Sequence, residues 1–408
     1  MVALVGAAVA ACPSACGGRI AEDASISPDK SSAEGGSGDG STEGAELAQG
    51  GTSETGDKKP TRIAAGDSFT CASGTSAIEC WGLNSDGQLG SGSAVNCDVP
   101  AIVSHPIQRP KRLVAGCNHT CALVSDVVSC WGNNKYGQLG VDWNLLKSSS
   151  VPATPVALSG PASDIAIGTY HSCAVVRGDV YCWGGNVFKQ LGASTMGDTW
   201  LPVVVKGMPS IVSEIAANTN LTCALASGSV YCWGDNSEGQ LGDAVVGQPE
   251  TAIRIQGLAL SATAVAVARE HACALLHDGT LACWGKNDRG QLGNGSFEAS
   301  RRPVTVKGGY SNVSAVSCGH SHCCLIASGK VACWGAGASG ELGGSFTDSA
   351  TPRAVNFSTG YQATHVSAGG NHSCAIVGQE LYCWGGNESG QLGNRTTTDS
   401  ATPVLVSL

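Results

Sequence analysis

The tripeptide Cys-Trp-Gly occurs seven times in this 408-residue chain at an almost constant interval. Successive tryptophans are separated by 50, 52, 50, 51, 50 and 50 residues. They are Trp81, Trp131, Trp183, Trp233, Trp284, Trp334 and Trp384. A fixed period of this size is typical of repeat proteins, in which each unit buries its apolar face against its neighbours. The sequence therefore predicts seven similar units, and the recurring residues are expected to serve the packing of each unit.

Each unit contains short apolar runs separated by glycine and asparagine turns, a pattern that indicates strands. Charged residues make up only 13% of the chain, and 57 residues are glycine. Few charged helical faces and many tight turns favour an all-β protein. No cluster of Lys or Arg stands out and the formal charge is −9, so a nucleic-acid surface is not expected.

Fourteen of the twenty cysteines form pairs nine or ten residues apart within the repeats. Between Cys173 and Cys182, a two-residue turn at Arg177 and Gly178 places the two cysteines opposite each other on paired strands. Counting from the turn, they occupy a non-hydrogen-bonded site, where Cα atoms lie about 4.5 Å apart and a disulfide can form. The nine-residue spacing therefore predicts a disulfide across a β-hairpin.

The fifth unit tests this interpretation because its cysteines, Cys273 and Cys283, are ten residues apart. Its turn, from His277 to Gly279, is also one residue longer, so the cysteines again face each other if the glycine adopts a left-handed conformation. The predicted disulfides are Cys71–Cys80, Cys121–Cys130, Cys173–Cys182, Cys223–Cys232, Cys273–Cys283, Cys324–Cys333 and Cys374–Cys383. Such regular pairing suggests an oxidising compartment.

Four further cysteines lie outside this pattern, and sequence alone does not assign their connectivity. Local pairing would join Cys97 to Cys117 and Cys318 to Cys323.

The first 60 residues differ from the repeats. Residues 1–16 are apolar and then rich in small residues, as in a secretion signal, and the sequence before Cys12 resembles a bacterial lipobox. Cys12 or Cys16 is the expected lipidation site, and an ordinary cleaved signal is the alternative. Residues 17–60 are rich in Gly, Ser and acidic residues and are expected to form a flexible linker, with the repeats occupying 61–408. These features predict an extracytoplasmic protein, attached to a membrane only through the lipid.

The units resemble the repeats of the regulator-of-chromosome-condensation family. The resemblance covers residues 61–408 and rests on a Gly-x-x-His-x-x-Ala stretch, the hairpin, Trp-Gly-x-Asn and a Gly-Gln-Leu-Gly tail. Lys189 replaces the first glycine of the tail in the third unit, and Glu341 replaces the glutamine in the sixth. Complete tails stand at 87–90, 137–140, 239–242, 290–293 and 390–393.

This resemblance implies a seven-bladed β-propeller. Most units end in a proline and a β-rich run, so we expect the C-terminal strand to complete the first blade and close the ring. The resemblance also implies guanine-nucleotide exchange on a small GTPase as one possible function. The near-constant repeat length leaves no room for the inserted β-wedge associated with exchange in the namesake, and an exported protein would not meet cytosolic GTPases.

Histidines recur two residues before the first hairpin cysteine in five units. Phe69 and Leu221 occupy this position in the other two and cannot bind metal, so a structural role is expected, with no metal or cofactor. The histidines are His119, His171, His271, His322 and His372.

Aromatic residues in and after the tails are better candidates for a binding site because they vary between units. If the propeller forms, these loops share one face, and exposed aromatics there would make a protein-binding patch. The alternative is that each ring covers its own blade. The candidates are Tyr136, Trp143, Phe188, Trp200, Phe297 and Phe346.

No catalytic motif is present in the sequence. We therefore expect a monomeric, non-enzymatic binding module for a protein or another macromolecule. An enzyme acting on polysaccharide is disfavoured because no pair of acids converges in the sequence.

Overall fold

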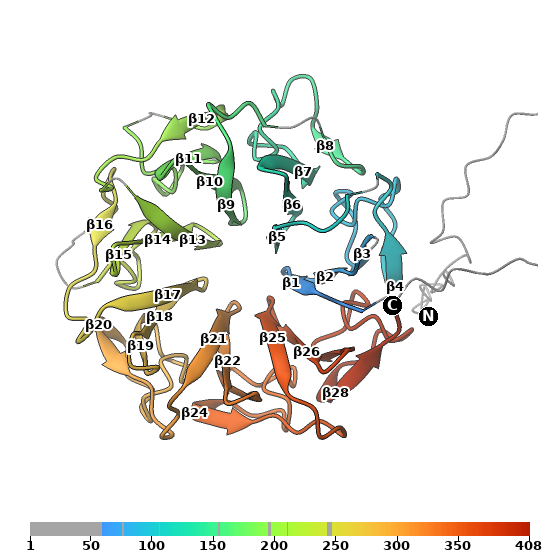
Figure 1. Ribbon diagram of the computed structural model, residues 1–408, viewed down its shortest axis with the longest axis vertical. Helices are drawn as coiled ribbons and strands as arrows, with labels where there is room; N and C mark the ends of the chain where they lie inside the picture. The colour runs from blue at the N-terminus through green and yellow to red at the C-terminus, as the bar shows by residue number, and fades with distance from the viewer. Residues whose placement is uncertain are drawn as a thin grey trace, which may run out of the picture.

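The computed structural model describes residues 59–408, with gaps at 76, 106, 154–155, 195–196, 210 and 243–246. Within these residues, 28 strands form seven four-stranded antiparallel sheets arranged in a ring (Figure 1). The predicted seven-bladed β-propeller is confirmed. None of the described segments forms a helix that could cross a lipid bilayer. The predicted signal, Cys12, Cys16 and all but the last two residues of the predicted linker lie outside the described residues.

Each blade consists of four strands in sequence order, from the centre of the ring outwards (Figure 1). The inner strands are β1 (Arg62–Ala65), β5 (Arg112–Ala115), β9 (Ala162–Ile167), β13 (Val212–Asn218), β17 (Ala262–Val267), β21 (Val313–Cys318) and β25 (Ala363–Ala368). The second strands are β2 (Phe69–Ser73), β6 (His119–Val124), β10 (His171–Val176), β14 (Leu221–Ala226), β18 (His271–Leu276), β22 (His322–Ala327) and β26 (His372–Val377). The third strands are β3 (Ile78–Gly82), β7 (Val127–Asn133), β11 (Asp179–Gly184), β15 (Ser229–Gly234), β19 (Leu281–Gly285), β23 (Lys330–Gly335) and β27 (Glu380–Gly385). The outer strands are β4 (Cys97–Ile102), β8 (Ser148–Ser149), β12 (Thr199–Val204), β16 (Ile253–Arg254), β20 (Ser300–Thr305), β24 (Ser349–Ala354) and β28 (Ser400–Val406).

The hairpins have the predicted register. Cys173 pairs with Cys182, and the turn residues Arg177 and Gly178 have φ values of 53° and 89°. Positive φ at both turn positions is the conformation that suits a two-residue hairpin. In the fifth blade Leu276 N donates to Thr280 O at 2.8 Å, so the longer turn keeps the cysteines opposite each other.

The seven predicted cysteine pairs are disulfide-bonded, with Cα atoms 4.0–4.1 Å apart. Cys318 and Cys323 form a further disulfide across β21 and β22. The suggested Cys97–Cys117 pairing is wrong, because Cys117 carries a free thiol that contacts Thr169 Oγ1 at 2.9 Å.

Tryptophan joins every blade to the one before it. Each indole N–H donates to the main-chain carbonyl of the glutamine in the preceding blade's tail, or of Glu341, at 2.8–3.0 Å. The pairs are Trp81–Gln391, Trp131–Gln88, Trp183–Gln138, Trp233–Gln190, Trp284–Gln240, Trp334–Gln291 and Trp384–Glu341. The last tail glycine has no room for a side chain: a Cβ on Gly393 would lie 2.7 Å from Trp81 Nε1. Tail and tryptophan therefore recur together because they form one contact, and we call each blade-to-blade contact a seam.

The recurring histidines are buried within the seams and do not converge on a common site. His119 Nε2 lies 2.9 Å from the Ser172 hydroxyl of the next blade, which donates to Gln138 O at 2.8 Å. Since the hydroxyl proton is used on the carbonyl, His119 Nε2 carries the proton and donates. Burial lowers the pKa of all five histidines to about 3, so they are neutral at pH 7.

The expectation that the C-terminal strand completes the first blade is wrong. Strand β28 pairs with β27 of its own blade, while β4 already supplies the outer strand of the first blade. The ring closes through side chains and loops instead. Trp81 donates to Gln391 O at 2.9 Å, and Ala65 N donates to Ser367 Oγ at 2.9 Å.

Candidate functional site: the loop face

The loops from inner to second strands and from third to outer strands emerge at the same end of the propeller, because adjacent strands are antiparallel. We call this end the loop face. Its tails are fixed by their own side chains. In the first blade Leu89 N donates to Asn84 Oδ1 at 3.0 Å, and Asp86 N donates to Gln88 Oε1 at 2.9 Å. The repeated residues thus form a rigid base, and the loops that follow can vary.

One position per blade surrounds the mouth of the central channel on the loop face. It lies between the inner and second strands, two residues before the histidine position, and its occupants differ in chemistry. They are Asp67, Cys117, Thr169, Thr219, Arg269, His320 and Gly370. Asp67, Cys117, Thr219 and His320 line a common cavity at this mouth. The repeat therefore fixes the position of these side chains, while the residue type at this position varies between blades.

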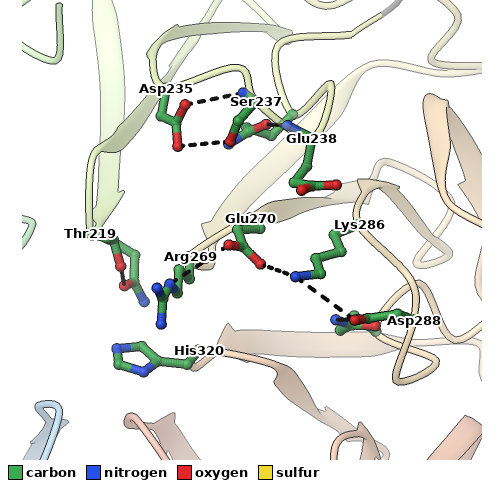
Figure 2. Close-up of polar contacts among 12 residues, drawn as sticks. Thr219, Asp235, Ser237, Glu238, Arg269, Glu270, Lys286, Asp288 and His320 are labelled. Atoms are coloured by element: carbon green, nitrogen blue, oxygen red, sulfur yellow. Dashed lines mark hydrogen bonds and ion pairs between the residues drawn. The ribbon is translucent and has the colours of Figure 1, made fainter. Parts of the chain in front are cut away.

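The polar groups at the mouth do not form an activated nucleophile. Burial, with a contribution from Asp67, raises the pKa of the Cys117 thiol to about 12. His320 Nε2 lies 3.3 Å from Asp67 Oδ1, but burial lowers the pKa of the imidazole. Figure 2 shows Arg269 and Thr219 near His320 at this mouth. A protonated thiol beside these groups suits hydrogen bonding to a ligand better than attack on one.

The fifth blade carries a cluster of paired charges beside the mouth (Figure 2). Lys286 Nζ lies 2.7 Å from Glu270 Oε2 and 3.8 Å from Asp288 Oδ2. The hydrogen bond to Glu270 raises the pKa of Lys286. Arg289 extends the pairing to the sixth blade, with Nη1 3.2 Å from Asp348 Oδ2. These charges are largely satisfied within the protein.

The second and third blades carry aromatic rings instead. The rings of Tyr136 and Tyr170 lie 4.8 Å apart between centroids. Trp143 and Trp200 both pack over Gly137, where an added Cβ would lie 2.9 Å from Trp143 Cε3 and 2.7 Å from Trp200 Cβ. All four aromatic residues are partly exposed. We call Tyr136, Trp143, Tyr170 and Trp200 the aromatic patch.

Three of the six aromatic candidates from the sequence lie in this patch, and the others do not join them in the same way. Phe188 is half-buried in the tail of the third blade. Phe297 and Phe346 are 54% and 55% exposed, in loops of the fifth and sixth blades. Tyr170 was missed by the sequence argument. Its signal was available, because it directly precedes the recurring histidine, where no other unit has an aromatic residue.

A second polar group lies on the inner strands along the central channel, a cavity of about 270 Å³. Arg112 Nε lies 2.6 Å from Asp164 Oδ1, and Asp164 Oδ2 accepts a hydrogen bond from Ile215 N at 3.0 Å. Burial raises the pKa of neighbouring Glu214 to about 7, against the opposing effect of Arg112. Glu214 also accepts a backbone hydrogen bond from Val265. Each carboxyl group accepts a hydrogen bond from the inner strand of the next blade, so we assign both groups a structural role.

The closed ring of seven four-stranded sheets places the protein in the class of β-propellers. The chain itself belongs to the RCC1-like domain family, whose model matches residues 29–325 and 128–408. A search of curated protein sequences found no match.

Solved structures share the fold at low sequence identity. Human WBSCR16 is 22% identical, with a TM-score of 0.73 over 82% of this chain and 94% of its own. Yeast RCC1 (Prp20) bound to Kap60 is 21% identical, with a TM-score of 0.71 over 82% and 84%. Prp20p from Saccharomyces cerevisiae, described with its binding to Gsp1p and histones, is 20% identical, with a TM-score of 0.70 over 86% and 88%. An RCC1-like propeller suggests a protein-interaction module or a role like that of an exchange factor.

Proposed function

We propose that this chain is a binding module that holds a partner protein on its loop face, with the aromatic patch as the anchor. The observation that supports the proposal is that two adjacent blades bring four partly exposed aromatic side chains to the loop face. Tyr136 contacts Tyr170, and Trp143 and Trp200 meet at Gly137, the residue after Tyr136. Large, rigid aromatic side chains supply most of the binding energy in many protein interfaces. The charged cluster of the fifth blade would then lie at the polar rim of the interface, where ion pairs contribute specificity more than affinity.

We also propose that the protein is exported and tethered by a lipid on Cys12 or Cys16. The disulfides of the seven hairpins support an oxidising location. Fractionation of the native host, combined with counting of free thiols without reduction, tests this part. A cytosolic pool of fully reduced protein would contradict it. The lipid is tested separately by the shift in mass of the N-terminal peptide in the Cys12→Ala and Cys16→Ala variants.

Nucleotide exchange on a small GTPase is the second candidate function. It is favoured by the fold shared with Prp20p, described with its binding to Gsp1p. It is disfavoured by the blades themselves, since each described sheet has four strands in sequence order and none has an inserted strand pair.

The binding proposal is tested with the double variant Trp143→Ala, Trp200→Ala. The matched control is Phe297→Ala, Phe346→Ala, which removes two exposed aromatic rings from other blades of the same face. A partner captured by the wild type should be retained by the control and lost, by at least tenfold in affinity, by the tryptophan variant. Equal affinity for all three proteins would remove the aromatic patch as the anchor. Acceleration of nucleotide release from a captured GTPase would instead support the second candidate.

A further inference from the structure

Among the described residues, only the seam between the fifth and sixth blades carries a disulfide that joins an inner strand to a second strand. Cys323 stands one residue after the histidine position, where other blades have Thr70, Ser172 or Ser373. Its partner Cys318 stands at the end of the inner strand, where the seventh blade has Ala368. The sixth blade thus replaces a hydroxyl that binds the neighbouring histidine with half of a disulfide.

Three potential metal ligands meet at this seam. His271 Nε2 lies 3.1 Å from Cys323 Sγ, and the ligand atoms of His271, Cys318 and Cys323 all lie within 4.8 Å of one another. His271 and Cys323 are 0% exposed and Cys318 is 6% exposed. A tetrahedral zinc site with Zn–S bonds of about 2.3 Å places its ligand atoms roughly 3.5–3.8 Å apart. The three side chains are therefore within small rotations of such a site.

His271 is also poorly satisfied where it stands. In the closing seam, Thr70 Oγ1 lies 2.8 Å from His372 Nε2 and donates its own proton to Gln391 O at 3.0 Å. A disulfide sulfur has no proton and is a weak acceptor, so it replaces the hydroxyl imperfectly. The Nδ1 atom of His271, like that of the other four recurring histidines, has no hydrogen-bond partner among the described residues. His271 therefore differs from the other four in the weak partner of its Nε2 atom, which leaves this nitrogen suited to a stronger ligand.

We propose that reduction of the Cys318–Cys323 disulfide opens a site for a soft divalent cation such as Zn²⁺. A dithiol reductant is oxidised to its own disulfide while the Cys318–Cys323 bond is converted to two thiols. Metal binding then releases both thiol protons to solvent, and His271 supplies the Nε2 lone pair with its proton on Nδ1. Cys273, whose Sγ lies 3.9 Å from that of Cys323, becomes a fourth ligand if its bond to Cys283 is also reduced.

Another seam of the same protein shows which apolar residues can replace two of the proposed ligands. In the seam between the fourth and fifth blades, Leu221 and Ala272 occupy the positions of His271 and Cys323, and both are 0% exposed. The double variant His271→Leu, Cys323→Ala therefore copies a pair that already packs within this ring. The control His372→Leu, Thr70→Ala makes the same exchange in the closing seam and leaves the three ligands intact.

The probe is Co²⁺, which gives thiolate-to-metal absorption when it replaces zinc at thiolate sites. Oxidised and reduced proteins are titrated with Co²⁺ and then with Zn²⁺, while circular dichroism monitors folding. We expect one Co²⁺ per chain, displaced by Zn²⁺, in the reduced wild type and in the control. The oxidised wild type and the reduced His271→Leu, Cys323→Ala variant should lack this band.

Equal cobalt binding by the reduced site variant would overturn the proposal, because the signal would then come from reduced hairpin cysteines. Absence of binding by the reduced, folded wild type would overturn it as well. So would unfolding of the reduced wild type in both the presence and the absence of zinc, since the site requires the folded seam.

Discussion

The seam that closes the ring and the seam between the fourth and fifth blades do the same task with different residues. Both keep the indole bond: Trp81 donates to Gln391 O at 2.9 Å, and Trp284 donates to Gln240 O at 2.8 Å. The closing seam adds Thr70, which contacts His372 Nε2 at 2.8 Å and donates to Gln391 O at 3.0 Å.

The fourth–fifth seam has no such polar pair. Leu221 and Ala272 take the places of histidine and hydroxyl and pack in one apolar cluster. The difference shows that the indole bond is the constant requirement of a seam.

The histidine and the hydroxyl can also be replaced separately. In the first–second seam Thr120 donates to Gln88 O at 2.8 Å with Phe69 at the histidine position. In the fifth–sixth seam His271 contacts Cys323.

Acid should destabilise the seams that contain a buried histidine and should have no such effect on the apolar fourth–fifth seam. The five histidines have a folded pKa of about 3 and an unfolded pKa near 6.5. Below pH 6.5 the unfolded chain binds protons that the folded chain excludes, so their stabilisation is present above pH 6.5 and is lost as the pH falls toward 3. Each histidine can contribute up to about 1.4 kcal/mol per pH unit. Urea unfolding between pH 7 and 4 should show this loss, with a shallower slope for His372→Leu, Thr70→Ala, and a flat profile would contradict it.

Removal of the indole donor should cost most where no second donor reaches the same carbonyl. Trp284→Phe is expected to lower the free energy of unfolding by about 2–4 kcal/mol, through a lost hydrogen bond and a small cavity. Trp81→Phe should cost less, because Thr70 still donates to Gln391 O. Chemical denaturation of both variants gives the comparison, and a larger loss for Trp81→Phe would refute the ranking.

A double-mutant cycle measures the coupling energy between Thr70 and His372 in the closing seam. Thr70→Ala should destabilise by about 1–3 kcal/mol, because the Nε2–H group of His372 is left buried without an acceptor. The double variant His372→Leu, Thr70→Ala should cost less than the sum of the two single changes. Additive single effects in thermal or urea unfolding would mean that the two side chains do not act as a unit.

The fourth–fifth seam should show a pH dependence of opposite sign, through the single group Glu214. Burial raises its folded pKa to about 7, above the ordinary value of 4.5, so the folded state holds its proton more tightly than the unfolded state. The resulting stabilisation is complete below pH 4.5 and is lost as the pH rises through 7. Glu214→Gln should therefore be more stable than the wild type by up to about 3 kcal/mol at pH 8, and by less than about 1 kcal/mol at pH 5. A constant difference across this range would count against titration of Glu214.

The sequence predicted the features that depend on contacts within one repeat. The Cys173–Cys182 register and the longer turn of the fifth blade follow from counting residues across a hairpin. The seven-fold period predicted the number of blades. Contacts between blades were harder to predict from the sequence, because their residues can be far apart in the chain. Thr70 and His372, for example, are separated by 302 residues.

The candidate site was predicted only in part for the same reason. Tyr136 and Tyr170 meet because consecutive blades place their loops side by side, which local patterning does not reveal. The closure was mispredicted because a terminal β-rich run is equally compatible with its own blade and with the first.

Closure without strand exchange has a consequence for how the chain can be cut and rejoined. Every sheet is a continuous segment of sequence, so a break in any linker between blades leaves seven intact sheets. Circular permutants that join the present ends and open the chain at another linker should conserve all sheet pairing and all seven indole contacts. The ring has no structurally privileged first blade, and new termini can be placed on either side of the aromatic patch without dividing a blade.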